Sequence, residues 1–401
     1  MSSYSSPSLK KVMRSNLCAG CGLCAGVSDG AITMGRDAEG FLRPSQSEHV
    51  AETTEKKIEA CCPGLRVSRP RNASNYHPVW GAYSEAHVGW STNEALRKHG
   101  SSGAVLSAIA HYLVQSGKVD FILTICDDDE DPISNATYMA KTYEDVYRAA
   151  GSRYAPSAPL SQINEFLESG KRFAVIAKPC DISALRTLSR FDRRVNEQVP
   201  YLLSFFCAGV PSREGAVQVL EKLSVTEDDL SSFRFRGDGW PGFAKAVRKD
   251  GSSSTMSYSD SWGGILSNYV QFRCKVCPDG TGGSADLVCA DAWNSDENGY
   301  PVFEDEDGKS LVLPRSDVGL ALMQEVIAAG SIEIGPFDMS KLIAIQPGQR
   351  RRSYALLARL LGLFLKRGAR PRFTGFSVFR NARALSPAAF LKTFIGTFRR
   401  A

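Results

Sequence analysis

The sequence has little that would suit export, membrane insertion or hydrolytic chemistry. Its first residues, MSSYSSPSLKKVMRSN, contain no apolar run of the kind that a signal peptide needs. Nowhere do some twenty apolar residues follow one another, as a membrane span requires. No Ser/His/Asp arrangement stands out. The eleven cysteines, without an export signal, argue against a disulfide scaffold and favour metal or redox chemistry. We therefore expect a cytoplasmic protein.

Acidic residues are absent from Gly348 onward, where 13 Lys and Arg residues occur. The remainder of the chain carries about −8, although the whole chain carries +5. This asymmetry marks residues 341–401 as a basic amphipathic tail with its own role. Its Leu-rich run with Arg flanks predicts a helix with three alternative positions: on an anionic membrane surface, on an acidic partner protein, or packed on the main domain with its charges solvated. No recognition motif accompanies the charge, so we expect no nucleic-acid partner.

Strand and helix patterns alternate from about residue 66. The apolar runs VDFILTIC, RFAVIAK and VPYLLSFFCAGV are typical of buried strands, and helical stretches separate them. This order predicts an α/β fold with a mainly parallel sheet core, followed by an irregular α+β portion. Cys126 and Cys289 lie in apolar runs and are expected in the core. The acidic run DDDEDP at 127–132 predicts a solvated loop, with a cation site as the alternative.

The expected organisation has four parts. Residues 1–65 form a small ferredoxin-like module, residues 66–223 an α/β domain, residues 224–340 a portion that carries a Cys-x2-Cys loop, and residues 341–401 the tail.

Three cysteines at three-residue steps, Cys18, Cys21 and Cys24, are followed much later by Cys62 in EACCPGL. A C-x2-C-x2-C step with a distant Cys-Pro is the spacing of ferredoxin-like 4Fe–4S binding. The small residues between the cysteines let the backbone wrap closely around a bulky inorganic core. Zinc is the alternative, although a zinc site usually takes two C-x2-C pairs. Cys61 is the alternative fourth ligand, but the proline after Cys62 favours Cys62.

A second set of cysteines follows predicted strands. Cys180 begins a helix after RFAVIAK, Cys207 ends the strand YLLSFFCAG, and FRCKVCPDG supplies Cys274 and Cys277. Neighbouring parallel strands deliver their carboxyl ends to one edge of a sheet. Four thiolates gathered there would hold a second cluster. The alternative is two ordinary buried thiols beside a C-x2-C pair that binds zinc or nothing, and spacing alone does not decide between these interpretations.

Six segments occur in the order of a known family: RKHGSSGAVLSAIAHYL, AAGSRYAPSAPL, AVIAKPCDISALRTL, LLSFFCAG, FRFRGDGWPG and FRCKVCPDGTGGSADLVCADAW. Over roughly residues 15–320 the chain thus resembles the coenzyme F-420 hydrogenase/dehydrogenase beta-subunit family. It also resembles the plant 7-hydroxymethyl chlorophyll a reductase and bacterial iron–sulfur flavoproteins. The resemblance implies FAD in the 66–223 domain and 4Fe–4S clusters. By the same resemblance, the core cluster beside the flavin is held by Cys180, Cys207, Cys274 and Cys277, and a ferredoxin-like cluster is held by Cys18, Cys21, Cys24 and Cys62.

The residues themselves give the flavin a physical basis. The turn HGSSGA lies at a helix N-terminus, where free amides suit a pyrophosphate or a flavin carbonyl, although a serine N-cap is the simpler alternative. Arg153 is a planar donor suited to phosphate, and Lys178 either places a positive charge near the cofactors or forms a salt bridge at the sheet edge. Asp291 matches the acidic residue of the family's GDA segment. The residues expected to bind the flavin are Gly100, Ser101, Ser102, Gly103, Ser152, Arg153, Tyr154, Lys178 and Asp291.

Three departures from the family pattern place the substrate in question more than the cofactors. They are SSGA for SSGG, Lys178 before the Pro-Cys pair, and VCADA for VGDA. The function implied is an FAD- and iron–sulfur-dependent oxidoreductase that passes electrons from a ferredoxin-like donor through two 4Fe–4S clusters to FAD and an organic acceptor. Two alternatives remain: an electron-input subunit of a larger dehydrogenase or hydrogenase-like complex, and a zinc-bound structural module without flavin.

Overall fold

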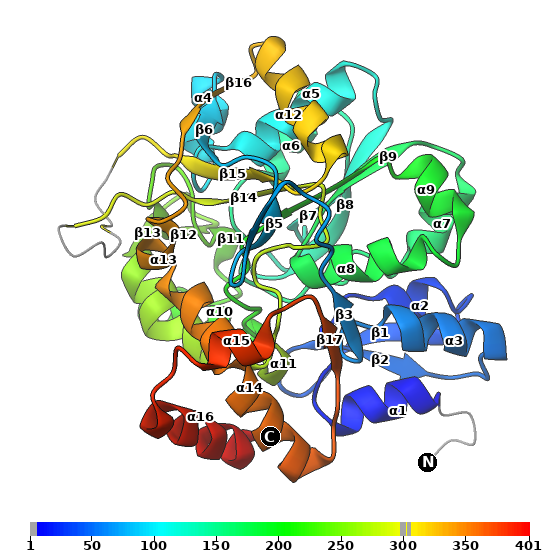
Figure 1. Cartoon of the computed structure of the whole chain (residues 1–401). Coiled ribbons are helices and arrows are strands. Elements are labelled where there is room, and N and C mark those ends of the chain that lie inside the picture. Colours follow the sequence, from blue (N-terminus) through cyan, green and yellow to red (C-terminus); the bar gives the residue numbers. More distant parts are fainter. Residues whose placement is uncertain (1–5, 297–301, 303–305) are drawn as a thin grey trace.

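One mixed β-sheet organises the protein, as Figure 1 shows in a computed structural model that describes residues 6–296, 302 and 306–401. The spatial order of its strands in the described residues is β16 (Ile332–Pro336), β6 (His87–Ser91), β15 (Ser310–Pro314), β14 (Leu287–Asp291), β10 (Tyr201–Phe205), β9 (Phe173–Ile176), β7 (Phe121–Asp127) and β8 (Asn135–Ala140). The neighbours β14, β10, β9 and β7 run parallel, and the flanking strands pair antiparallel. The predicted α/β class is confirmed, with parallel pairing concentrated at the centre of the sheet.

Helices cover both faces of this sheet. One face carries α5 (Val105–Gln115), α6 (Tyr143–Ala149) and α12 (Asp317–Ala328), and α4 (Glu94–His99) precedes α5. The other face carries α7 (Ile163–Glu168), α8 (Pro179–Leu188) and α9 (Arg193–Gln198). Successive strand residues alternate between the two cores: Ile122 packs with the first group, and Phe121 and Leu123 pack with the second. Because both faces are buried, these strands read in the sequence as continuous apolar runs.

The irregular portion expected after Ser224 forms a separate three-stranded antiparallel sheet. Its strands are β11 (Leu230–Arg234), β12 (Phe243–Arg248) and β13 (Ser253–Ser257). They share a core with α10 (Arg213–Lys222), the π-helix η1 (Ser259–Ile265) and the 3-10 helix η2 (Leu266–Tyr269). The short helix α11 (Phe272–Lys275) follows and carries the first cysteine of the C-x2-C pair.

The N-terminal segment builds a small module beside α8. It contains α1 (Pro7–Arg14), α2 (Leu23–Gly26), the hairpin β1 (Ile32–Arg36) and β2 (Leu42–Gln46), and α3 (Glu52–Cys61). In Figure 1 these blue elements lie below α8, and both α2 and α3 contact that helix. The chain then passes through β3 (Arg66–Ser68) and the hairpin of β4 (Asn75–His77) and β5 (Gly81–Tyr83) to reach the main sheet.

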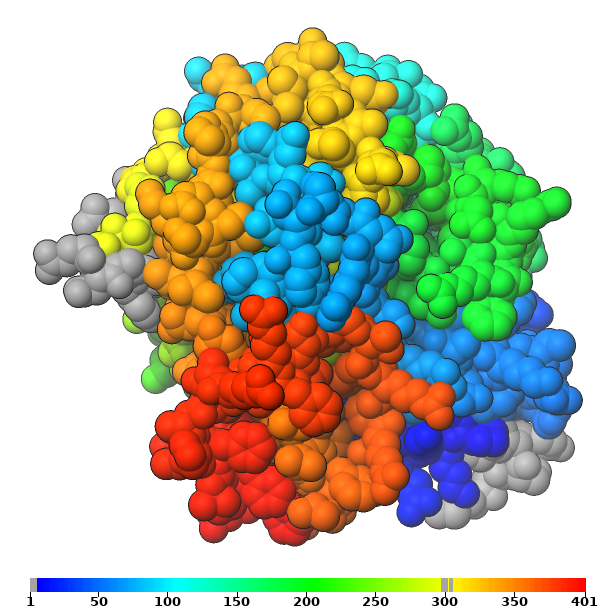
Figure 2. All heavy atoms as spheres, in the orientation of Figure 1, coloured from blue at the N-terminus to red at the C-terminus, as the bar shows by residue number. Residues whose placement is uncertain are grey.

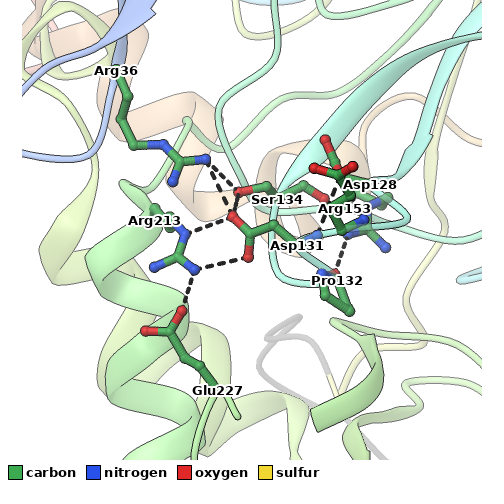
Figure 3. A network of polar contacts seen from close by, with 9 residues as sticks. Arg36, Asp128, Asp131, Pro132, Ser134, Arg153, Arg213 and Glu227 are labelled. Atoms are coloured by element: carbon green, nitrogen blue, oxygen red, sulfur yellow. Dashed lines mark hydrogen bonds and ion pairs between the residues drawn. The ribbon is translucent and has the colours of Figure 1, made fainter.

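The acidic loop after β7 is tied to its neighbours by Asp131. Its carboxylate accepts from Arg213 of α10 at 2.7 and 2.8 Å and pairs with Arg36 of β1 at 3.3 Å (Figure 3). Burial raises the pKa of Asp131, but the hydrogen bonds from Arg213 and Ser134 outweigh burial, and the net pKa lies below its usual range. The loop therefore joins the N-terminal module to α10 through the ion pairs of Asp131 with two arginines.

The tail packs against the rest of the protein. It contains α13 (Leu342–Ile345), α14 (Pro347–Arg367), β17 (Arg372–Thr374), α15 (Val378–Ala382) and α16 (Pro387–Arg400). β17 pairs with β3 in parallel, and Leu363 of α14 shares a core with Leu17 and Val276. A Cβ on Gly362 would lie 2.8 Å from the Phe394 carbonyl oxygen, so glycine permits α14 and α16 to approach closely. In the described part of the chain, no helix has both the length and the apolarity to cross a membrane.

Candidate functional site

The four cysteines of the N-terminal cysteine set, defined as Cys18, Cys21, Cys24 and Cys62, line one small cavity. The chain reaches them through the loop between α1 and α2, through α2 itself, and through the C-cap of α3. Gly20 and Gly22 adopt positive φ values of 75° and 84°, which let the loop fold back between the cysteines. A Cβ on Gly22 would lie 2.7 Å from the Ser161 amide nitrogen, so the loop also packs tightly on the main domain.

Cys62 and Cys61 face different surroundings. Cys62 lines the cavity with the other three thiols, whereas Cys61 packs in the core between α8 and the sheet. The pKa of the Cys62 thiol is raised to about 12, chiefly by burial and also by Cys18, although the amides of Gly64 and Leu65 oppose the increase. The arrangement thus presents Cys62 as the fourth member of the set.

The core cysteine set, defined as Cys180, Cys207, Cys274 and Cys277, gathers at the carboxyl edge of the sheet. Cys180 lies in the first turn of α8 after β9, and Cys207 follows the adjacent parallel strand β10. The Cys207 amide donates to the Gly280 carbonyl at 2.9 Å, which holds the C-x2-C loop over the strand ends. The pKa of the Cys207 thiol is raised to about 12, chiefly by burial and further by the neighbouring Cys274 and Cys277. The structure therefore brings together the four residues that the sequence grouped.

Seven thiols of the two sets have a raised pKa: Cys18, Cys21, Cys24, Cys62, Cys180, Cys207 and Cys277. Burial is the main cause of the raised pKa of Cys18, Cys21, Cys180 and Cys277. Holding such groups as thiolates requires a bound cationic centre, because the thiolate is the ligand and its proton must be displaced. Within the described ranges, no three His, Cys, Asp or Glu side chains converge on a single point that would hold one metal ion.

Arg273 is a buried arginine between the two cysteine sets with hydrogen-bond donors that could bind an acceptor there. Arg273 is 3% exposed, and its Nε and Nη1 atoms have no hydrogen-bond partner among the described residues. Its presence lowers the thiol pKa of Cys18, Cys62 and Cys277 against the effect of burial. Iron–sulfur clusters accept hydrogen bonds at sulfur, so the donor set suits them.

A larger cavity, here named the sheet-edge cavity, opens beside the core cysteine set. It has a volume of about 300 Å³ and reaches the ends of β7, β9, β10 and β14, with Cys207 in its wall. This size is at the lower end of small-molecule sites, and the carboxyl edge of an α/β sheet is where ligands commonly bind. Of the residues expected to bind the flavin, those that line it are Gly100, Ser101, Ser102, Ser152, Arg153, Tyr154, Lys178 and Asp291.

Gly103 lies behind the cavity wall. A Cβ there would be 2.4 Å from the Gly89 carbonyl oxygen and 2.8 Å from the Ser310 amide nitrogen. The alternative of a serine N-cap is wrong, because Ala104 takes the N-cap position of α5 and no side chain caps that helix. The Ser102 hydroxyl instead lies 2.9 Å from the Ser310 hydroxyl, which fixes the loop to β15.

Arg153 donates hydrogen bonds to oxygen atoms in and beside the loop after β7. Its Nη2 donates to the carbonyl oxygens of Pro132 at 2.8 Å and Ser134 at 2.7 Å, and its Nε donates to Asn135 at 2.6 Å (Figure 3). Oxygen atoms around the loop after β7 thus accept three of its hydrogen bonds, while Arg153 also lines the sheet-edge cavity, and a role in holding phosphate stays a prediction.

Lys178 forms the salt bridge that was one of its two predicted roles. Its Nζ lies 2.8 Å from Asp181 Oδ2 and donates to the Ser157 carbonyl at 3.2 Å, and the side chain lines the sheet-edge cavity. Burial lowers the pKa of Lys178, but attraction to Asp181 outweighs burial, and the net pKa is raised. The cavity wall therefore contains a lysine cation that Asp181 and Ser157 fix in position.

Asp291 belongs to a buried pair that the sequence did not reveal. Its carboxylate accepts two hydrogen bonds from Arg236, both 2.9 Å long, and a third from Trp240 Nε1 at 3.3 Å. The Arg236 guanidinium lies over the rings of Tyr258 and Trp293, at 4.6 and 4.9 Å. The motif FRFRGDGWPG contained the signal for Arg236, but the partner lies 55 positions away.

The tail completes the cavity wall. Gln349 of α14 donates to the Cys207 carbonyl at 2.8 Å, and Gln346 donates to the Asp291 carbonyl at 3.0 Å. Both glutamines line the cavity. Nothing in the local sequence pattern of the tail indicates these contacts.

Two family models match the part of the chain that builds the sheet and its cavity. The sequence model for "Coenzyme F420 hydrogenase/dehydrogenase, beta subunit N-term" matches residues 86–164, and the model for the C terminus of the same protein matches residues 170–340. Together they contain the core cysteine set and most of the sheet-edge cavity wall. The N-terminal cysteine set lies outside both matches.

Relatives extend the likeness over most of the chain. The beta subunit of the coenzyme F420 hydrogenase of Methanococcus voltae is 24% identical over 71% of this chain and 98% of that protein. A subunit of the F(420)H(2) dehydrogenase of Methanosarcina mazei is 23% identical over 80% of this chain and 91% of that protein. A chain of the F420-reducing [NiFe] hydrogenase complex from Methanosarcina barkeri shares the fold, with a TM-score of 0.56 and 21% identity over 71% of this chain and 95% of that chain.

Proposed function

Because the chain belongs to the coenzyme F420 hydrogenase/dehydrogenase beta-subunit family, we propose that it is an iron–sulfur flavoprotein oxidoreductase. In this proposal, electrons pass from a ferredoxin-like donor through two 4Fe–4S clusters to FAD and then to an organic acceptor. One observation carries the proposal: Cys207 belongs to the core cysteine set and also lines the sheet-edge cavity. A cluster held by the core set would therefore share the Cys207 residue with a flavin bound in this cavity.

The bound groups supply the redox chemistry, since clusters carry single electrons and a flavin joins one-electron to two-electron transfer. The chain's own residues bind and orient them. The two cysteine sets would hold the clusters, and the loop of Gly100–Ser102, which lines the sheet-edge cavity, would border the flavin. The buried cation of Lys178 favours an anionic ring, because a positive charge stabilises a nearby negative one most strongly where water is excluded. Gln346 and Gln349 close the wall from the tail.

A subunit role is the second candidate, and the relatives' names favour it. Several of them are beta subunits of hydrogenases or dehydrogenases. In this form the chain would receive or deliver electrons for a partner subunit. A partner retained during gentle anaerobic purification would support this role, and turnover by the isolated chain with a reduced donor would argue against it.

Metal and flavin analysis of the anaerobically purified full chain tests the proposal. We expect about eight irons, matching acid-labile sulfide and one FAD per chain, with about four irons lost in Cys277→Ser. Cys289→Ser, which changes a buried thiol outside both sets, serves as the matched control and should keep all eight. A colourless protein that holds stoichiometric zinc would overturn the proposal.

We further propose that the tail rests on an anionic membrane surface. Leu361 and Leu365 of α14 and Leu391 and Ile395 of α16 are exposed large apolar side chains, each pair one helical turn apart. Figure 2 displays these helices, in orange and red, along the lower surface of the molecule. No acidic residue follows Gly348, so the charge there complements anionic lipid.

Sedimentation with vesicles tests the membrane contact. The full chain should bind vesicles that contain phosphatidylserine, bind phosphatidylcholine vesicles weakly, and release in high salt. Leu391→Ser should weaken binding severalfold, and the buried-face control Ala358→Ser should not. Equal recovery with both lipids, or none with either, would contradict this contact and favour an acidic protein partner or a solvated tail.

A further inference from the structure

The segment Gln271–Cys274 lies between the two cysteine sets and contacts both. Gln271 Nε2 donates to the Ala19 carbonyl at 3.3 Å and lies 3.5 Å from the Cys274 sulfur. Its Oε1 accepts from Arg43 Nη1 at 3.0 Å, and that nitrogen also reaches the Cys18 carbonyl at 3.4 Å. One side chain therefore connects the loop of the N-terminal set to a sulfur of the core set.

Arg273 makes the second connection. Its Nη2 donates to the Pro63 carbonyl at 2.7 Å, next to Cys62, and its backbone adjoins Cys274. The guanidinium is buried, and the ring of Phe373 from β17 covers it at 5.7 Å. Two of its donor nitrogens have no partner among the described residues. A buried cation with unpartnered donors is costly unless an anionic acceptor lies beside it.

We infer that Arg273 is a positioning and tuning residue shared by both clusters, which sets their reduction potentials together; this inference rests on the proposed function. Each cluster gains negative charge when it takes up an electron. A buried positive charge beside both clusters stabilises both reduced forms, because the Coulomb interaction is little screened there. The two potentials therefore rise together, which keeps the clusters matched for electron passage.

Two other arginines provide matched controls because each acts on one set. Arg43 reaches the Cys18 carbonyl of the N-terminal set, 3.4 Å from its Nη1 atom. Arg352 donates to the Cys207 carbonyl of the core set at 2.9 Å. Arg273 differs from both, because it donates to the Pro63 carbonyl beside Cys62 and precedes Cys274 in the chain.

The test is an anaerobic redox titration of the full chain, followed by electron paramagnetic resonance, with Cys62→Ser used to assign the two cluster signals. In R273Q we expect the equilibrium constant for reduction to fall at least tenfold for each cluster, which is about 59 mV for a one-electron couple. R43Q should lower the potential of the N-terminal cluster alone, and R352Q that of the core cluster alone. R273K, which keeps the charge, should recover most of the loss, whereas a merely structural role would not follow charge.

The outcomes separate this inference from the proposed function. Two cluster signals in the parent chain, with R273Q moving one potential or neither, would overturn the shared role and leave the proposed function standing. A parent chain without iron–sulfur signals would overturn both. If R273Q loses its clusters, the variant Arg273→Met is measured in its place, because methionine keeps the aliphatic packing against Phe373. The reduction potentials of both clusters should fall in this variant as well.

Discussion

Removing the Asp291 carboxylate should destabilise the protein strongly. The carboxylate accepts a hydrogen bond from each terminal nitrogen of Arg236, both 2.9 Å long, and the Arg236 side chain is only 2% exposed. In Asp291→Ala the guanidinium stays buried with its charge unpaired. Truncating one partner of such a pair costs about 3–5 kcal/mol, because the remaining charge has lost its compensation. Asp291→Asn keeps one acceptor and the shape, so its loss should be about half as large.

Urea unfolding of the anaerobic protein, followed by tryptophan fluorescence, measures this loss. The midpoint should fall with little change in the slope. Flavin retention should fall as well, since Asp291 lines the sheet-edge cavity. The control is Glu197→Ala, which breaks an exposed pair with Arg193 whose side chains are 87% and 52% exposed, and it should change stability by less than about 0.5 kcal/mol. A free energy of unfolding for Asp291→Ala within about 0.5 kcal/mol of the parent value would refute the reasoning.

Three further predictions address the cysteine assignment, the cavity loop and the acidic loop. Cys62→Ser should lose about four irons and Cys61→Ser none, by iron analysis, because only Cys62 lines the cavity of the N-terminal set; equal loss would contradict this assignment. Gly103→Ala should cost about 1–3 kcal/mol in urea unfolding, because its Cβ would lie 2.4 Å from a carbonyl oxygen. Gly263→Ala, which meets no atom within 4 Å, should be near neutral, and similar losses would refute the packing argument. Asp131→Asn should reduce stability by about 1 kcal/mol at pH 7. Because the pKa of Asp131 is lowered in the folded state, this contribution is present above about pH 4 and is lost as the pH falls through the folded-state pKa; a difference that stays constant from pH 7 to pH 3 would contradict it.

The sequence predicted the fold class well, because the physical signal is local. Strands buried on both faces read as continuous apolar runs, and VDFILTIC and RFAVIAK became β7 and β9. The grouping of Cys180 with Cys207 followed from the rule that parallel strands present their carboxyl ends together, and β9 and β10 are indeed adjacent and parallel. The antiparallel flanks of the sheet were not predicted, since they depend on how distant segments such as β6 and β16 pair.

The contacts that the sequence did not predict share one cause, which is that each joins residues far apart in the chain. The planar guanidinium of Arg153 has a donor geometry that suits phosphate, yet it donates hydrogen bonds to the carbonyl oxygens of Pro132 and Ser134. Arg236 stood in a quoted motif, but only the fold brings Asp291 to it. The basic composition of the tail predicts a separate element, yet Gln349 near the start of α14 donates to the Cys207 carbonyl.

Single-turnover reduction of the flavin by a reduced ferredoxin tests the central claim most directly, namely that electrons enter at the N-terminal cysteine set and reach the sheet-edge cavity through the core set. The parent chain and Cys62→Ser would be mixed with the donor under anaerobic conditions, and flavin absorbance followed with time. We predict that flavin reduction is at least tenfold slower in Cys62→Ser while dithionite still reduces its flavin. Equal rates with ferredoxin in the two proteins would contradict the account.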